Sequence, residues 1–356
     1  MLSLTNEFNL LDIHSVRTLK QGAVFLLEGN GPKIVVKREE LNEKDAKHFD
    51  LSRKAMGVID KDVKASHRLS ARELAALTGF VAHQKHEVNT QMMGRLPGAT
   101  ADLDLALNAL GNSGTDKVWY KMPLVNMMTL QDAWDAKLGS EARSREGTFA
   151  TVQQSDEPMR TFLKTLRASG GLESLGQVIA IDQFSGNKDR VRPQRSKRDF
   201  VNTNYPSAKY RLEVIQNVGN LMIIGTGKAR TISGMDFADP NSMLKHADAA
   251  LAAQTSQAGA EFWGTTIADP VKRKAFAKLV IADLETIFNS GPQKKKGFLD
   301  RMGDQTALGS DARSRLEKGM VKGAKVLVKY IDDRISRGKP YPQSFLDRAK
   351  VYRDMA

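Results

Sequence analysis

The stretch that decides the fold is Ile181–Arg190, which reads IDQFSGNKDR. An apolar helix, predicted over residues 171–184, runs into Gly186, and the turn after it presents Asn187 and Asp189 beside an arginine. Burial of that helix would hold these polar groups at a rigid edge. Because Gly-Asn-x-Asp-Arg on its own is more typical of an ordinary turn than of a site, its meaning depends on the residues downstream of it.

Two short apolar strands are predicted downstream, each with a polar group at one end. Asn220 directly precedes the first strand, Leu221–Ile224, and Asp236 follows the second, Thr231–Ile232. Phosphoryl transfer requires an Asp that orients the acceptor hydroxyl, and an Asn and a second Asp that hold magnesium. Magnesium prefers oxygen ligands from few side chains, with water and phosphate completing its shell. The order Asp189, Asn220, Asp236 therefore predicts a phosphotransfer site.

The N-terminal part of the chain is predicted to be rich in strands. Residues 12–40 form strands around a turn at Glu28–Pro32, where Gly and Asn meet the need for positive φ. Apolar residues at helical spacing predict a helix over 67–87, with Ser66 or Ser70 as its cap.

Lys37 is the predicted phosphate-binding cation. It ends the apolar strand Ile34–Val36, from which a lysine can reach the α- and β-phosphates of ATP across an interlobe cleft. The alternative is an ordinary solvated lysine at a strand end. Glu73 on the following helix is predicted to orient Lys37 by an ion pair, with Glu87 as its substitute. The turn at Gly22 is predicted to cover the phosphates with backbone N–H groups.

The rest of the chain is predicted to be mostly helical. Val118–Met122 is a strand that ends at Pro123, where the boundary between two lobes is placed. The fold class is α+β and bilobal, with a small strand-rich N-lobe at 1–122, a helical C-lobe at 123–290 and a helical C-terminal extension at 291–356. The predicted helices are 101–110, 129–138 (capped by Thr129), 158–168, 171–184, 241–256, 268–289, 310–337 and 342–354, with loops at 139–157 and 188–211.

Composition removes several classes of function. The 356 residues include no Cys, which excludes disulfides, thiolate nucleophiles and Cys-based zinc sites. No apolar run approaches about 18 residues and no classical signal peptide is present, so a soluble protein without a transmembrane segment is expected. The net charge of +13 suits acidic proteins, anionic membrane surfaces or polyphosphates as partners, or serves solubility alone. With 6% aromatic residues, nucleic-acid binding is not expected.

These residues together resemble the atypical protein kinases related to actin-fragmin kinase, the phosphoinositide 3- and 4-kinases and the HipA-like kinases. The resemblance covers roughly residues 12–290 and rests on Gly22–Val24, Val35–Lys37, the hinge Met122–Pro123, Gly186–Arg190, Gly219–Met222 and Met235–Phe237. It implies that Asp189 is the catalytic base, assisted by Lys37 and Arg190. It implies that Asn220 and Asp236 hold the metal, with Asn217 as the alternative to Asn220. It also implies that Gly22, Lys37, Glu73 and Met122 contact or support ATP.

The predicted function is an ATP- and Mg²⁺-dependent Ser/Thr kinase that acts on a protein, with Mn²⁺ as an alternative metal. The resemblance extends to secreted bacterial effectors, so the predicted location is cytoplasmic or inside a host cell. Nucleotidyl (AMP) transfer and lipid phosphorylation on the same fold stay open, as does an inactive pseudokinase or basic interaction module. The basic segment from Arg190 to Arg211 is predicted to select an acidic protein segment or an anionic headgroup, or to be a solvated loop.

Overall fold

The computed structural model has a mixed α+β fold, as the sequence predicts. It divides into two compact units: unit 1 comprises residues 1–50, 60–125 and 143–148, and unit 2 the remainder. The change from one to the other after Val125 lies close to the predicted boundary at Pro123. The structure describes residues 1–20, 23–41, 46, 50, 54, 57, 67–92, 100–111, 117–124, 127–138, 141–143, 149–151, 155–185, 187, 190–193, 198–201, 209–225, 230–234, 264–289, 307–339 and 343–355.

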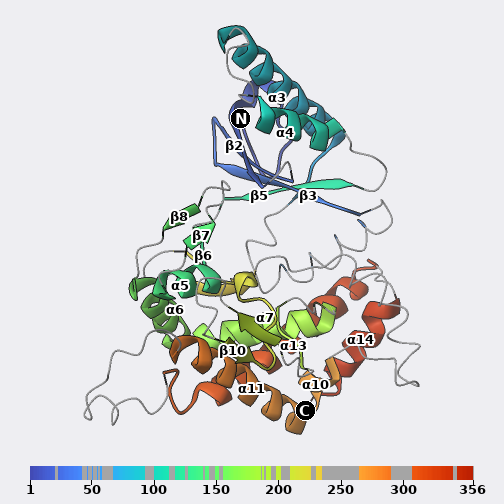
Figure 1. Cartoon of the computed structure of the whole chain (residues 1–356). Coiled ribbons are helices and arrows are strands. Elements are labelled where there is room, and N and C mark those ends of the chain that lie inside the picture. Colours follow the sequence, from blue (N-terminus) through green and yellow to red (C-terminus); the bar gives the residue numbers. More distant parts are fainter. Residues whose placement is uncertain are drawn as a thin grey trace. The chain divides into compact units, whose positions relative to one another are not determined.

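Unit 1 is built on a five-stranded antiparallel sheet with the order β1-β2-β3-β5-β4 (Figure 1). Gly31 in the turn between β2 and β3 has φ +138°, which confirms the predicted need for glycine there. The elements are η1 Leu10–Asp12, β1 Ile13–Lys20, β2 Val24–Gly29, β3 Ile34–Glu39, β4 His67–Arg68, α3 Ala71–Met92, α4 Ala101–Gly111 and β5 Val118–Pro123.

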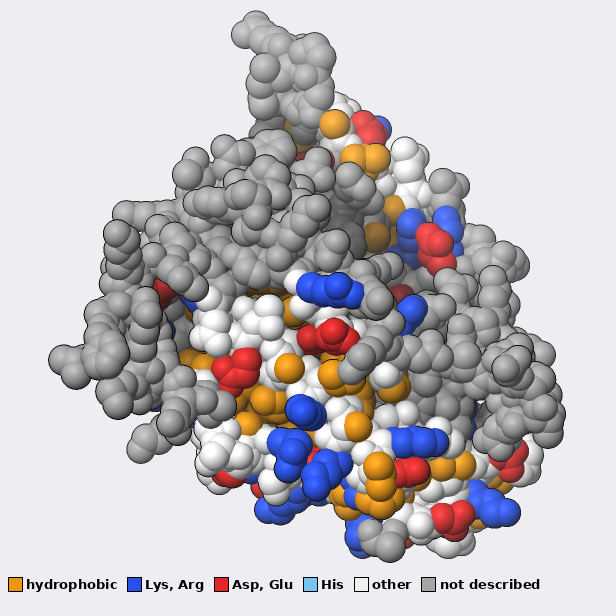
Figure 2. Space-filling view, turned by 60° about the horizontal axis from the view of Figure 1, so that its bottom comes forward, with side chains coloured by type: hydrophobic (Ala, Val, Ile, Leu, Met, Phe, Trp, Pro, Cys, Tyr) orange, Lys and Arg blue, Asp and Glu red, His pale blue; other side chains and the backbone are white. Residues whose placement is uncertain are grey.

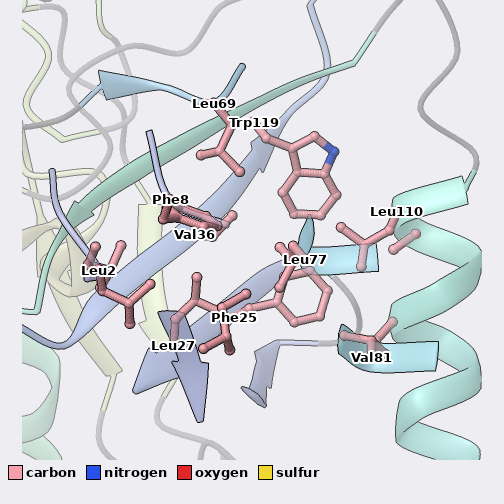
Figure 3. Packing of buried hydrophobic residues seen from close by; sticks show 14 residues of the cluster. Leu2, Phe8, Phe25, Leu27, Val36, Leu69, Leu77, Val81, Leu110 and Trp119 are labelled. Carbon is pink, nitrogen blue, oxygen red and sulfur yellow. The ribbon is translucent and has the colours of Figure 1, made fainter. Parts of the chain in front are cut away.

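One face of this sheet packs against α3 and α4. Phe25 and Val36 from the strands meet Leu77 of α3 and Leu110 of α4, and Trp119 stacks on Phe25 with ring centroids 5.5 Å apart (Figure 3). Alternation along β3 puts Ile34 and Val36 on this face and Val35 and Lys37 on the other. The helices thus cover one face, and Lys37 belongs to the opposite one.

Unit 2 is mostly helical and contains a three-stranded sheet with the order β12-β11-β6. Thr129 caps α5 as predicted, because its Oγ1 accepts the N–H of Asp132 at 3.0 Å. The elements are β6 Met127–Thr129, α5 Leu130–Leu138, β7 Glu141–Arg143, β8 Phe149–Thr151, α6 Glu157–Arg167, α7 Gly171–Ser185, β9 Arg198–Val201, β10 Lys209–Leu212, η2 Val218–Asn220, β11 Leu221–Ile224, β12 Thr231–Gly234, α10 Gly264–Ala268, α11 Pro270–Asn289, α13 Ala312–Ser336 and α14 Gln343–Arg353.

Two loop predictions are wrong in part. Within 139–157 the structure has the paired strands β7 and β8, and within 188–211 it has the hairpin of β9 and β10. Both segments are polar or charged, but the hydrogen bonds of a β-ladder join peptide groups and do not require apolar side chains. The predicted helix 241–256 lies outside the described residues.

The C-terminal segment predicted as an extension is part of the core of unit 2. Helix α14 binds the last turn of α7: Arg348 Nη1 donates to the Phe184 carbonyl at 2.7 Å, and Tyr352 Oη donates to the Ala180 carbonyl at 2.8 Å. Both side chains are buried. The far C-terminal helix therefore helps to fix the helix end that leads into Asn187.

Helices α7 and α13 approach closely through glycines. A Cβ on Gly176 would lie 2.3 Å from the Leu316 carbonyl oxygen, and one on Gly319 would lie 2.2 Å from the Glu173 carbonyl oxygen. On Gly323 it would lie 2.8 Å from the Gln177 Cα. The neighbouring atoms are backbone, which a side-chain rotation cannot move aside.

We expect Gly319→Ala to lower the free energy of unfolding by about 1–3 kcal/mol, because the added methyl forces α7 and α13 apart. Alanine has a higher helix propensity than glycine, so propensity alone would raise the free energy of unfolding. A decrease therefore indicates that the close packing of the two helices dominates. Urea denaturation followed by far-UV circular dichroism measures it. The control is Gly111→Ala at the end of α4, where no atom lies within 4 Å of the added Cβ. Equal stability of both variants and the parent would contradict this packing.

No described helix is both long and apolar enough to cross a membrane.

Candidate functional site

Lys37 shares one face of the unit 1 sheet, opposite to the face that α3 and α4 cover, with other residues of the predicted nucleotide site. It lies opposite Val24 on β2 and Tyr120 on β5, and Val35 lies opposite Met122. In an antiparallel sheet, directly opposed residues point to the same side. Lys37 is partly exposed, with 27% of its side chain accessible, and its Nζ lies 3.0 Å from Glu39 Oε1. The structure thus brings Val24, Lys37 and Met122 onto one face.

Glu73 does not orient Lys37, and this prediction is wrong. Its Oε1 accepts from Lys121 Nζ at 2.6 Å, in an ion pair whose side chains are 2% and 3% exposed. Lys121 lies opposite Val36 on the helix-covered face, so the sheet separates this pair from Lys37. Glu87, the substitute, lies 3.7 Å from His83 on the exposed side of α3.

The Glu73–Lys121 pair ties three segments of unit 1 together. Lys121 Nζ also donates to the Asn6 carbonyl at 2.8 Å, and Glu73 Oε1 accepts the N–H of Phe8 at 3.3 Å. Glu73 further closes a capping box with Ser70, which confirms Ser70 as the cap of α3. Glu73 therefore has a structural role in anchoring the N-terminal segment.

Arg190 is the centre of a buried network in unit 2. Its Nη1 donates to both oxygens of Asp182, at 2.6 and 2.7 Å, and both side chains are fully buried. Its Nε donates to the Asn220 carbonyl at 2.8 Å. A Cβ on Gly234 would lie 2.3 Å from the guanidinium carbon, so only glycine fits there. Arg190, which the sequence predicts to be catalytic, is thus fully buried, and its described contacts are with Asp182, Asn220 and Gly234.

The same network closes the end of helix α7. The Asn187 backbone N–H donates to the Asp182 carbonyl at 2.9 Å, and its side-chain Nδ2 donates to Asp182 Oδ1 at 3.1 Å. Asp182 therefore binds the turn that the sequence singled out as well as the arginine that comes after it.

Asn220 and Asn217 have different surroundings. Asn217 Oδ1 accepts the N–H of Gly219 at 3.0 Å and so caps η2. Asn220 ends η2, is 6% exposed, and stands directly before the buried strand β11. Asn217 thus has a local structural role, and both asparagines lie at the entry to β11, where the sequence predicts the metal ligand.

Asp283 of α11 holds the segment that runs beside Arg190. Its Oδ1 accepts the N–H of Glu213, and its Oδ2 accepts those of Val214 and Ile215, each at 2.8 Å. Burial raises the pKa of the Asp283 carboxyl, against the opposing effect of the three N–H donors.

The anchored segment pairs in turn with the residues just after Asp189. The Arg192 N–H donates to the Val214 carbonyl at 2.8 Å, and the Gln216 N–H donates to the Arg190 carbonyl at 2.9 Å. Asp283 is thus connected to the predicted catalytic turn: it binds residues 213–215, and this segment pairs antiparallel with residues 190–192.

Three predicted site residues, Gly22, Asp189 and Asp236, lie outside the described residues. The described neighbours of the two aspartates are Arg190 and Gly234, which lie against each other. No group of three or more His, Asp or Glu side chains suited to a metal occurs in the described part of the chain.

Sequence reasoning missed Asp182 and Asp283. Both interrupt apolar helical runs, Val178–Ile181 and Leu279–Ala282. A charged residue at a buried helical position must be paired or hydrogen-bonded, so this placement was an available signal. Lys121, within the strand Val118–Met122, carried the same signal.

Comparisons with protein-family models, with curated proteins and with solved structures found no match.

Proposed function

We propose that this protein is an ATP- and Mg²⁺-dependent kinase, related to the atypical kinases that resemble actin-fragmin kinase, and that it phosphorylates Ser or Thr of a protein substrate. Asp189 orients the acceptor hydroxyl and takes its proton, and Lys37 contacts the ATP phosphates. Asn220 and Asp236 hold the metal, with Mn²⁺ able to replace Mg²⁺. Bound magnesium neutralises charge that develops on the transferred phosphoryl group.

The observation that carries the proposal is the convergence of three separate sequence motifs on one guanidinium. Arg190 follows Asp189 directly, its Nε binds the Asn220 carbonyl, and its guanidinium lies against Gly234, two residues before Asp236. The motifs come from a helix end, a strand entry and a strand exit. A fully buried ion pair with Asp182 fixes the position of that guanidinium. Such rigid support is what a phosphotransfer site requires, because its catalysis depends on positioning and charge.

The sheet face of unit 1 that carries Lys37 gives separate support. Val24, Val35 and Met122 offer an apolar surface of the kind that an adenine ring contacts, and Lys37 adds a cation on the same face.

The test is incubation of the purified full chain with Mg²⁺ and either γ-labelled or α-labelled ATP, with casein and a cell extract as acceptors. We expect label transfer from γ-labelled ATP only. Asp189→Ala should lower the rate by about 10²–10⁴-fold, the usual contribution of a positioned base. Asp236→Ala should abolish the dependence on Mg²⁺ concentration together with most of the turnover.

Lys37→Met should weaken the use of ATP without unfolding the chain, and Lys33→Met is its matched control. Lys33 lies on the exposed hairpin, where it pairs with Glu28. Transfer of the α-label would replace the kinase with a nucleotidyl transferase. Unchanged turnover in Asp236→Ala would refute the metal assignment, and no transfer of either label would favour a binding module.

A further inference from the structure

Lys37 has a carboxylate partner on its own strand. Lys37 and Glu39 stand at alternate positions of β3, so both side chains lie on the same sheet face. Lys37 Nζ lies 3.0 Å from Glu39 Oε1. Opposite them on β5 stand Tyr120 and Val118, which are 1% and 5% exposed. Because β3 lies between β2 and β5, the pair forms along an interior strand, beside buried neighbours.

This ion pair is less exposed than an ordinary surface pair. Basic and acidic side chains lie beside one another on the face of the molecule that Figure 2 shows, and most surface pairs contribute little energy. Lys33 and Glu28 of unit 1 form a surface pair, with side chains 56% and 42% exposed. The side chains of Lys37 and Glu39 are 27% and 16% exposed. Their reduced contact with water weakens screening, which strengthens the attraction between the two charges.

The glutamate of α3 that the sequence assigns to Lys37 is held elsewhere. Glu73 pairs with Lys121 on the helix-covered face, and its carboxylate also accepts the N–H groups of Phe8 and Ser70. Both members of this pair are buried, and parting them would leave a buried charge without its partner, which is strongly destabilising. Glu73 therefore stays with Lys121.

We propose that Glu39 is the positioning residue for Lys37, and that the nucleotide site of unit 1 consequently does not depend on the position of α3. The inference rests on the proposed kinase function. The lysine ammonium carries three N–H donors, so it can keep a hydrogen bond to Glu39 while the other donors reach the phosphates of ATP. An ammonium that is already held in place also loses less conformational freedom when the nucleotide binds.

The proposal has a consequence for regulation. A kinase whose lysine is oriented by a helix glutamate can be switched by moving that helix. A lysine that is oriented within β3 keeps its position for as long as β3 stays in the sheet.

The test is titration of the purified full chain, in Mg²⁺, with an ATP analogue that carries a methylanthraniloyl fluorophore on its ribose. Transfer from γ-labelled ATP to casein gives the KM for ATP and kcat. We expect Glu39→Gln to raise the Kd of the analogue and the KM for ATP about three- to tenfold, as the loss of one partly exposed ion pair would require, and to change kcat less. Glu39→Asp keeps the carboxylate and should recover part of the loss.

Two controls separate this role from other effects. Glu28→Gln breaks the exposed pair with Lys33 and should change neither Kd nor KM. The double variant Glu73→Gln, Lys121→Met removes the buried pair at α3 without leaving one charge alone, and it keeps an amide oxygen for the cap of the helix. It should leave the Kd of the analogue unchanged.

Equal or tighter binding of the analogue by Glu39→Gln would overturn the inference, because Glu39 would then compete with the phosphates for Lys37. Equal losses in Glu39→Asp and Glu39→Gln would overturn it in favour of packing, and a raised Kd in the double variant would return control to α3. A parent chain that neither binds the analogue nor transfers label would refute the proposed function, and this inference with it.

Discussion

Replacing Arg190 with methionine is expected to lower the free energy of unfolding of the full chain by about 3–5 kcal/mol, because the buried carboxylate of Asp182 then loses the guanidinium that pairs with it. Asp182 Oδ1 and Oδ2 both accept from Arg190 Nη1, and neither side chain is exposed. The Asn220 carbonyl also loses the donor that Nε supplies. Urea denaturation followed by circular dichroism measures the loss.

A double-mutant cycle separates the energy of the ion pair from the energy of filling the same buried space. Arg190→Met with Asp182→Leu replaces two charges by apolar side chains, and we expect it to recover much of the stability lost in either single variant. The matched control is Glu173→Gln. Glu173 lies on α7, as Asp182 does, and forms an exposed pair with Lys318 of α13, so its loss should cost less than about 1 kcal/mol. Single-variant losses no larger than that of Glu173→Gln would contradict a supporting role for Arg190.

The elements that could be predicted from the sequence are those with strong local patterns. The helices α5, α7 and α13 were predicted within a few residues of their bounds because apolar residues recur at helical spacing, and Thr129 marks the start of α5. Strands β2 and β3 were predicted from β-branched runs around a Gly-Asn turn. By contrast, β6 has three residues, and the β9–β10 hairpin is charged, so neither offers a periodic pattern to detect.

The site was predicted less well, because its contacts join residues that are far apart in the sequence. In the sequence, Glu73 lies on the helix that follows the strand of Lys37, which suggested a pair. The sheet face on which each side chain lies depends on strand pairing, however, and that pairing puts Lys121 beside Glu73. Arg190 was assigned to catalysis because it follows Asp189. Its side chain points inward to Asp182 of α7 and lies against Gly234 of β12, contacts that no local sequence pattern indicates.

Replacing Asp283 with alanine is expected to lower the free energy of unfolding by about 3 kcal/mol or more, because three backbone N–H groups lose their acceptor in a buried setting. Glu213, Val214 and Ile215 donate to it at 2.8 Å each. Asp283→Asn keeps one acceptor oxygen and should fall between alanine and the parent. Because the anchored segment leads into Asn217–Asn220, turnover by the proposed kinase should fall in both variants, even at temperatures where they stay folded.

Asp269 on the same part of the chain provides the matched control. Its Oδ1 accepts the N–H groups of Val271 and Lys272 at 2.8 and 3.0 Å, in an exposed setting. Water can replace that carboxylate, so Asp269→Ala should cost only about 1 kcal/mol, the usual value of a helix cap, and leave turnover unchanged. If Asp283→Ala lowered the free energy of unfolding no more than Asp269→Ala does, the buried hydrogen bonds of Asp283 would stabilise the fold no more than an exposed cap. Helix α11 would then not support the segment that leads to Asn220.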